Sequence, residues 1–235
     1  AVQLGTEWHI PVHTQIRVAY SLAPAILEAL HERHINLLIM GWKGKSNNPE
    51  RIFGTAIDTL IRQAPCDLML VKLSDKLTQQ RQIYPSLTAR LHFNRWLMPL
   101  AGGPNSRQAL DLLPALTTIS STPEIQLCQI MPLQRSPRRR RDLLATSQTR
   151  LAQKLTCPIT TFALQSADIA EAILGLAQRN ACDVIVLGAS RESLLQKALH
   201  GSIPEAIIRR YPGTVILMRT LDRASTNRTS ADLSA

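Results

Sequence analysis

A glycine pattern that occurs twice, 147 positions apart, constrains the fold of this chain more than any other feature. Its members are Gly41, Gly44, Gly54 and Thr55 in the first copy and Gly188, Arg191, Gly201 and Ser202 in the second. In each copy a short apolar run leads into the first glycine, and an apolar-periodic segment follows the Thr or Ser. A strand that delivers a glycine loop to a helix N-terminus can bind phosphate through backbone N–H groups. The pattern therefore predicts two modules of a nucleotide-binding type.

The similarity between the two copies extends beyond the glycines. Residues 14–72 align with residues 161–219 without a gap, and the matched positions include proline, arginine and apolar residues. An ungapped match of this length indicates an internal duplication. Each copy reads as strand, helix, strand, loop, helix and strand, so we expect parallel strands joined by right-handed crossovers.

The expected elements lie at matching positions in the two copies. In the first copy they are strands near 14–19, 37–40 and 68–73 and helices near 23–33 and 56–63. In the second they are helices near 169–179 and 204–210 and strands near 184–187 and 214–219. Strands near 96–100 and 125–131 and helices near 107–116 and 142–155 precede the second copy. The predicted fold class is α/β: an open, mostly parallel five-stranded sheet with helices on both faces, one full copy plus one partial copy.

These patterns also predict the domain organisation. We expect residues 1–75 to be the C-terminal part of a first domain whose front half is absent, and residues 76–92 to be a polar linker. Residues 93–221 are predicted to form a complete second domain. Residues 222–235 are rich in Ser, Thr, Asp and Arg, a composition typical of a disordered tail.

Much of the formal charge of +10 lies in one segment, which contains Arg135 and the run Arg138–Arg141 beside two prolines. No aromatic residues are interleaved with these arginines and no helix-turn-helix pattern is present, so we expect no nucleic-acid partner. A cluster of four basic residues favours anionic lipid headgroups, which makes membrane contact through Arg138–Arg141 an alternative to a solvated loop. No apolar stretch approaches the roughly 18 residues of a membrane span.

Helix capping is an alternative explanation for the hydroxyls of the repeated pattern. Ser202 and Glu205 have the spacing of a capping box, and Pro204 lies in the first helical turn, where its missing N–H has no cost. Thr55 and Asp58 form a weaker version of the same device. Capping does not account for Gly44 or for the recurrence of the nine-residue spacing.

Other polar residues predict little chemistry. Lys72 and Arg219 end equivalent last strands and are expected to decorate a sheet edge. His31 and His34 lack a third ligand, so no metal site is predicted. The chain contains no GxSxG elbow, HExxH motif or Walker lysine, and we predict no catalytic residues.

The pattern G-x2-G-x9-G-[S/T] after the fourth strand of a five-stranded α/β unit resembles the ATP-binding branch of the universal stress protein (UspA-like) family. The segments Gly41–Gly44 and Met98–Pro104 look most like tandem stress-protein domains at the cytoplasmic end of bacterial membrane transporters, either amino-acid permease-like or chloride-channel-like. The resemblance covers residues 14–73 and 93–221. It implies a stress-response regulatory region at the inner face of the plasma membrane.

In this family the glycine stretches wrap the phosphates of the nucleotide, and the first strand ends in an aspartate near the adenosine. The resemblance therefore implies nucleotide binding by the eight residues of the repeated pattern and by the turn at Ala101 and Gly102. Ala101 stands where the aspartate would fall, and Arg191 stands where the second glycine belongs. Arg191 can either occlude the phosphate position or pair with a phosphate. Gly102 keeps the turn open to a ligand.

Two hypotheses about function follow. In the first, the chain is a non-catalytic sensor or regulatory module that binds ATP or another adenine nucleotide and is attached to a membrane transporter. In the alternative, both copies are degenerate dimerisation and interaction scaffolds whose last strands, 68–73 and 214–219, pair edge to edge and so protect each other. Slow ATP hydrolysis is the most catalysis that we expect.

Overall fold

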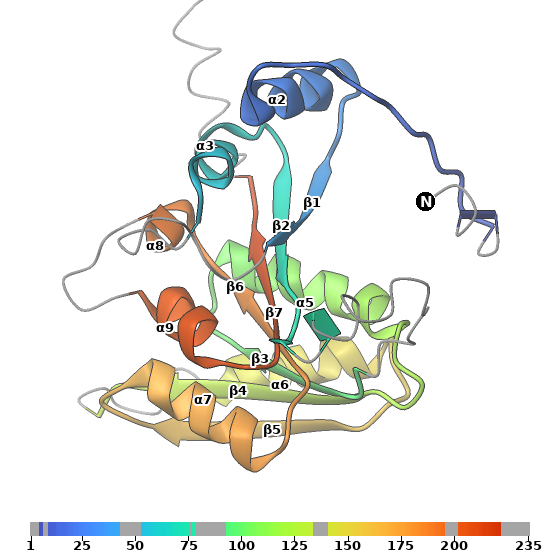
Figure 1. Cartoon of the computed structure of the whole chain (residues 1–235). Helices are drawn as coiled ribbons and strands as arrows, with labels where there is room; N and C mark the ends of the chain where they lie inside the picture. Colours follow the sequence, from blue (N-terminus) through green and yellow to red (C-terminus); the bar gives the residue numbers. More distant parts are fainter. Residues whose placement is uncertain are drawn as a thin grey trace, which may run out of the picture.

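A computed structural model of the protein describes residues 5–6, 9–42, 53–75, 77–78, 93–133, 141–195 and 202–221. Within these residues one sheet contains all the strands, and helices cover both of its faces (Figure 1). The strands are β1 (Leu37–Trp42), β2 (Asp67–Lys72), β3 (Arg95–Pro99), β4 (Glu124–Met131), β5 (Ile159–Gln165), β6 (Val184–Gly188) and β7 (Thr214–Arg219). The helices are α2 (Leu22–Glu32), α3 (Thr55–Gln63), α5 (Pro104–Thr117), α6 (Arg141–Ala152), α7 (Ile169–Arg179), α8 (Arg191–Leu195) and α9 (Ile203–Arg210).

The second half of the chain forms the predicted five-stranded parallel unit. Its strands lie in the order β5-β4-β3-β6-β7, and each neighbouring pair is parallel. The central strands are short apolar runs with almost no polar residues, as expected for parallel strands that are covered on both faces. The predicted α/β class with an open, mostly parallel sheet is therefore confirmed.

The first half joins this unit through an antiparallel contact. β1 and β2 are parallel to each other, and β2 pairs antiparallel with β7, so that a single seven-stranded sheet runs through both halves. The register places Leu70 opposite Leu217, two residues that are 147 positions apart. The predicted edge-to-edge pairing of the last strands is confirmed, with β2 beginning and ending one residue earlier than expected.

Two buried cations cross this antiparallel contact in a reciprocal way. The Lys72 ammonium donates to the carbonyl oxygen of Tyr211, the C-cap residue of α9, at 2.6 Å. The Arg219 guanidinium donates to the carbonyl oxygen of Ala64, the C-cap residue of α3, at 3.2 Å, and to that of Cys66 at 2.7 Å. The two cations are 147 positions apart, and so are the two carbonyl-bearing C-cap residues, Ala64 and Tyr211. The halves are therefore related by an approximate two-fold axis at Leu70 and Leu217.

A second pair of hydrogen bonds follows the same symmetry. The N–H of Ser74 donates to Thr214 Oγ1 at 3.1 Å, and the N–H of Leu221 donates to Asp67 Oδ1 at 2.8 Å. Ser74 and Leu221 are again 147 positions apart, as are Asp67 and Thr214. The last strand of each half is therefore fixed at both ends by the other half.

The expectation that Lys72 and Arg219 decorate a sheet edge is wrong. Their side chains are buried, with 8% of Lys72 and 2% of Arg219 exposed. Burial lowers the pKa of both groups, since desolvation disfavours the charged form. What compensates is the C-terminal end of a helix, where carbonyl oxygens lack intrahelical partners and carry partial negative charge.

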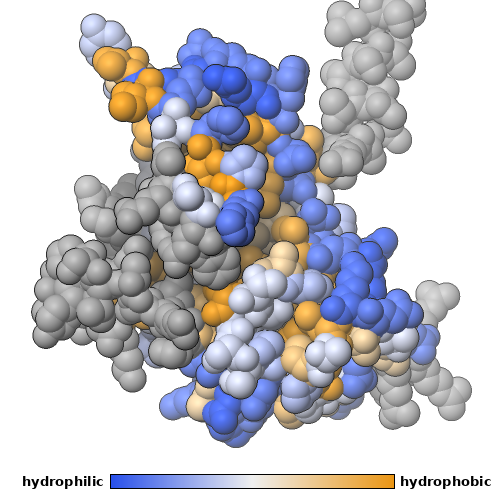
Figure 2. Space-filling view, turned by 90° about the vertical axis from the view of Figure 1, so that its right-hand side faces the viewer, coloured by the Kyte–Doolittle hydropathy of each residue, from blue (hydrophilic) through white to orange (hydrophobic). Residues whose placement is uncertain are grey.

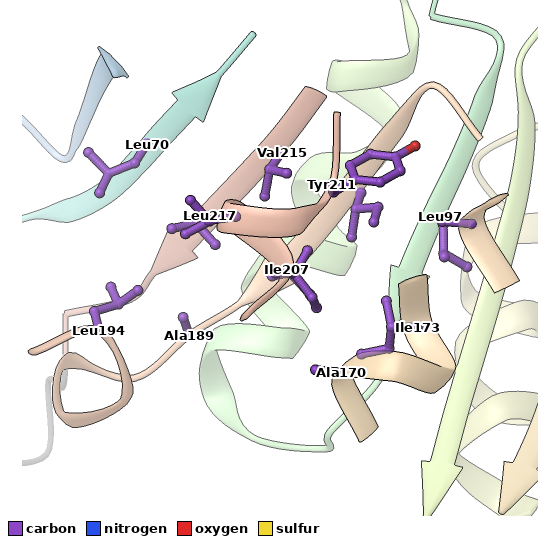
Figure 3. Packing of buried hydrophobic residues seen from close by; sticks show 14 of the residues in the cluster. Leu70, Leu97, Ala170, Ile173, Ala189, Leu194, Ile207, Tyr211, Val215 and Leu217 are labelled. Atoms are coloured by element: carbon purple, nitrogen blue, oxygen red, sulfur yellow. The ribbon is translucent and has the colours of Figure 1, made fainter. Parts of the chain in front are cut away.

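Side chains from the two faces of the sheet form two large apolar clusters. Figure 3 shows the cluster on one face, where α7, α8 and α9 pack on the sheet through residues such as Ile173, Leu194, Ile207, Tyr211 and Leu217. The other face is covered by α5 and α6, around Trp96, Met98, Val184, Val186 and Ile216. A smaller cluster joins α2 to the end of α3. The core is thus mainly aliphatic.

Three local expectations differ from the structure. The segment expected as a strand near 14–19 forms no strand, because no neighbouring strand is present among the described residues to accept its hydrogen bonds. The loop after β6 contains an additional short helix, α8. α5 begins at Pro104 rather than at Arg107, because Pro104 is favoured in a first helical turn.

Replacing Arg219 tests the reciprocal contact. Arg219→Ala should lower the free energy of unfolding by about 3 kcal/mol, because it removes a large buried side chain and leaves the carbonyl of Cys66 unpaired. Arg219→Met should cost less, since it keeps most of the packing volume and removes Nε and Nη1, which have no partner in the described structure. Urea denaturation of the two variants measures the difference, and equal losses would contradict this account.

Candidate functional site at the carboxyl edge of the sheet

The carboxyl ends of β3 and β6 are adjacent at the point where the strand order reverses. From β3 the chain moves outward to β4 and β5, whereas from β6 it moves the other way to β7. In open α/β sheets this switch point is where ligands bind, because the loops after the two strands diverge and leave a crevice. The turn after β3 leads into α5, and the segment after β6 leads into α8.

The turn between β3 and α5 contains two of the predicted site residues. Ala101 is exposed, and Gly102 is half-buried with φ of +83°, a left-handed conformation that favours glycine. Gly103 is the N-cap of α5, and no side chain accepts a hydrogen bond from the first turn at this cap. The turn therefore presents the N-terminus of a 14-residue helix, with its partial positive charge, beside the switch point.

Gly188 at the end of β6 has a packing function. A Cβ atom at this position would lie 2.5 Å from the carbonyl carbon of Asn105 and 2.6 Å from the Cα of Ser106. Real Cβ atoms do not approach backbone so closely. The glycine lets β6 pack directly on the first turn of α5, so its small size is needed whether or not a phosphate is bound.

The first turn of α5 also binds the end of β7. Asn105 Oδ1 accepts a hydrogen bond from the N–H of Thr220 at 2.6 Å. The N–H of Ala189, just after β6, donates to the carbonyl oxygen of Met218 in β7 at 2.9 Å. The carboxyl ends of β6 and β7 are therefore held together around the helix that follows β3.

The segment after β6 satisfies its own polar groups. Ser190 Oγ accepts a hydrogen bond from the N–H of Ser193 at 3.1 Å, which caps α8. The pKa of Glu192 is lowered, first by a hydrogen bond from its own backbone N–H and then by one from Ser190. Arg191 is exposed, and its charge contributes to lowering the pKa of Arg219. Arg191 is the predicted phosphate-pairing residue that remains accessible here.

Ser202 is confirmed as a helix cap. Its hydroxyl oxygen accepts a hydrogen bond from the N–H of Glu205 at 3.2 Å, while the Glu205 carboxylate receives one from Arg209 at 2.9 Å. The weaker device in the first half is not formed as expected, because Gly54, not Thr55, is the N-cap of α3. Thr55 is instead the first helical residue, and its carbonyl oxygen accepts a hydrogen bond from Thr59 Oγ1.

In the first half, Gly41 and Gly54 have open surroundings. A Cβ atom at Gly41 or Gly54 would meet no atom within 4 Å. Trp42, next to Gly41, contacts Phe53, next to Gly54, with ring centroids 4.9 Å apart, so this contact brings the two glycines near each other. Several residues discussed above lie outside the described residues: Gly44, Gly201 and Arg138–Arg140.

Taken together, the structure brings Ala101, Gly102 and Gly188 to the switch point, with Arg191 three residues after Gly188. Sequence reasoning missed Asn105 and the uncapped start of α5. The Gly103-Pro104 pair was the available signal, because glycine followed by proline is typical of a helix start. In the described part of the chain, no group of three His, Cys, Asp or Glu residues is placed to hold a metal ion.

Comparison with protein-family models identifies one match, the universal stress protein family, over residues 2–72 and 120–219. A curated relative is the Na(+)/H(+) antiporter NhaS5 of Synechocystis, 29% identical over 87 residues. That match covers 36% of this chain and 12% of the antiporter. The matched part of this chain thus spans only about an eighth of the antiporter's length. No helix in the described part of the chain is long and apolar enough to cross a membrane.

Two solved structures are reported for comparison. A universal stress protein from Archaeoglobus fulgidus has 16% identity and a TM-score of 0.60, over 85% of this chain and 66% of its own. A universal stress protein solved in complex with cAMP has 18% identity and a TM-score of 0.47, over 55% of this chain and 99% of its own. The first of these similarities supports the fold that the strand order shows.

The two equivalent glycines should respond in opposite ways to the same change. Gly188→Ala should lower the free energy of unfolding by about 3 kcal/mol, because the new methyl group overlaps the backbone of α5. Gly41→Ala should be neutral or stabilise by about 0.5 kcal/mol, because its surroundings are open and alanine reduces the freedom of the unfolded chain. Urea denaturation tests both, and similar effects would show that Gly188 does not pack as described.

Proposed function

The chain belongs to the universal stress protein family, and from this premise we propose that it is a non-catalytic regulatory module. It binds an adenine nucleotide at the carboxyl edge of β3 and β6 and conveys occupancy to a membrane transporter. A ligand can do this only if it binds one conformation of the module more tightly than another.

The observation that carries this proposal is the uncapped N-terminus of α5 at the switch point. No side chain at the Gly103 cap accepts a hydrogen bond from the first turn. The exposed Ala101 and the half-buried Gly102 leave the backbone of the preceding turn accessible. A nucleotide phosphate would compensate the free N–H groups and the partial positive charge of this helix end.

The same contacts change the roles assigned to the predicted residues of the second half. Gly188 is needed for packing on α5, and the hydroxyl of Ser202 caps α9, as that of Ser190, a residue not predicted as part of the site, caps α8. These three residues are therefore engaged without a ligand. In our proposal, α5 receives the phosphate and the exposed Arg191 pairs with it from the segment after β6.

Attachment to a transporter is supported by the relative. The 87 matched residues belong to an Na(+)/H(+) antiporter that is much longer than this chain. We propose that the module lies at the cytoplasmic face of a membrane as part of a larger protein.

A second candidate is an interaction scaffold without a ligand. The antiparallel pairing of β2 with β7 and the reciprocal bonds of Lys72 and Arg219 favour it, because they join the halves with no nucleotide present. The self-capping of α8 and α9 is equally compatible with this function.

Thermal unfolding in the presence of ATP, ADP, AMP and cAMP distinguishes the two functions. A bound nucleotide at a hundred times its Kd should stabilise the folded state by about 2.7 kcal/mol, which corresponds to a rise in Tm of roughly 5–10 °C. Arg191→Gln should reduce this rise, because it removes the proposed phosphate contact. Arg179→Gln, at the other end of the sheet on α7, is the matched control and should leave it unchanged.

An unchanged Tm at millimolar concentrations of all four nucleotides would favour the scaffold. Release of inorganic phosphate from ATP by the wild-type chain would instead contradict a non-catalytic module.

Contact with a membrane surface gives a further prediction. Replacing Arg138–Arg141 by glutamine should abolish co-sedimentation with phosphatidylserine vesicles, because each arginine near an anionic surface contributes about 1 kcal/mol. Binding of the wild-type chain should weaken as salt is added, since the attraction is screened. Salt-independent binding, or binding retained by the variant, would exclude the electrostatic contact.

A further inference from the structure

The free edge of β1 has no partner strand among the described residues. β1 is a terminal strand of the sheet and pairs with β2 alone. Its counterpart 147 positions later is β6, which has neighbours on both sides, β7 and β3. A free edge presents a row of unpaired N–H and C=O groups to any extended chain.

One face of β1 is also uncovered where the equivalent face of β6 is buried. Ile39 is 60% exposed, whereas Val186, its counterpart, is fully buried beneath α5 and α6. Ile39 and Val186 are both β-branched and apolar, so their equivalent positions predict that both side chains are buried. Figure 2, which views the side where β1 lies in Figure 1, shows hydrophobic surface between hydrophilic regions in the upper part of the molecule.

Gly41 provides the most specific clue. Its counterpart Gly188 must lack a side chain because the first turn of α5 rests on it. A Cβ atom at Gly41 would have no neighbour within 4 Å, and its φ is not left-handed, so no described contact requires a glycine there. A helix packed on β1 as α5 packs on β6 would explain why position 41 is a glycine.

The N-terminal segment completes the pattern. Residues 14–19 align with 161–166, which largely form β5, yet they are not paired as a strand. Arg17 forms ion pairs with Glu28 and Glu32 of α2. The alternate side chains Ile16 and Val18 are 94% and 100% exposed. In the second half, β3 and β4 lie between β6 and β5, and the described part of the first half contains no counterpart of these two strands.

We propose that these two strand positions are filled by a strand–helix–strand–helix unit built like β3–α5–β4–α6. Its first strand adds parallel to the free edge of β1, its first helix rests on Gly41 and covers Ile39, and its second strand pairs with residues 14–19. The unit is contributed by polypeptide N-terminal to this segment in a longer protein, because β3–α6 directly precedes β5 in the second half. The first half then forms the same five-stranded unit as the second.

A second copy of this chain fits the edge poorly. Its β3 is already flanked by β4 and β6, so it cannot pair with β1 without leaving its own sheet. Two copies related by a two-fold axis would pair their β1 edges antiparallel. That arrangement would not place a helix N-terminus on Gly41 as α5 is placed on Gly188.

Hydrogen exchange at β1 tests the proposal in two forms of the protein. One is the chain of residues 1–235, and the other is extended upstream by the roughly 60 encoded residues that two strands and two helices require. The carbonyl of Asn36 accepts from the N–H of Asp67, so Leu38 and Met40 also face β2, whereas Leu37 and Ile39 face the free edge. The amides of Leu37 and Ile39 should exchange at least about tenfold more slowly in the extended form.

Substitutions on β1 identify the docking mode. Gly41→Leu should not change the Tm of residues 1–235 but should lower that of the extended form and restore fast exchange at Ile39, because leucine occupies the place of the helix turn. Ile39→Pro removes a single free-edge N–H and should act in the same selective way. Met40→Pro is the matched control: it removes an N–H that faces β2 and should destabilise both forms.

Unchanged exchange in the extended form would overturn the proposal, as would upstream sequence without a strand–helix–strand–helix pattern. Concentration-dependent protection of Leu37 and Ile39 in residues 1–235 would show that a second copy occupies the edge instead. Because these readouts involve no nucleotide, their failure is independent of failure of the proposed function.

Discussion

The antiparallel pairing of β2 with β7 is the contact on which the arrangement of both halves depends. It places two buried cations, Lys72 and Arg219, each against the C-terminal end of the last helix of the opposite half. Burial of a charge is unfavourable unless hydrogen bonds compensate it, and helix-end carbonyls are unpaired acceptors that do so. Because each cation stabilises the other half, the contact favours one register, centred on Leu70 and Leu217.

The continuous sheet in turn fixes the candidate site. With β7 held on one side by β2 and on the other by β6, the carboxyl ends of β6 and β7 converge on the first turn of α5. That close packing uses Gly188, a residue whose type alone would indicate a phosphate loop. At this convergence the N-terminus of α5, after β3, has no side-chain cap, and in our proposal it receives the phosphate of a nucleotide.

The two halves have the same build but differ in completeness. The second half carries all five strands of the unit. Among the described residues, the first half presents a free strand edge, an exposed Ile39 and a glycine that no neighbour requires. In our proposal an upstream segment completes the first half, and the continuous sheet links that half to the candidate site of the second.

The sequence by itself determined the α/β class, the positions of most helices and strands, and the pairing of the last strands. Its apolar periodicity and 147-residue repeat specify these locally, and local pattern is what a sequence expresses directly. Only the tertiary structure decided the roles of Gly188, Lys72 and Arg219, and left residues 14–19 without a strand. Those outcomes depend on contacts between residues that are far apart in the sequence. The residue type of a lysine or arginine does not show whether its charge is buried or exposed. A strand, in turn, forms only where a neighbouring strand accepts its hydrogen bonds.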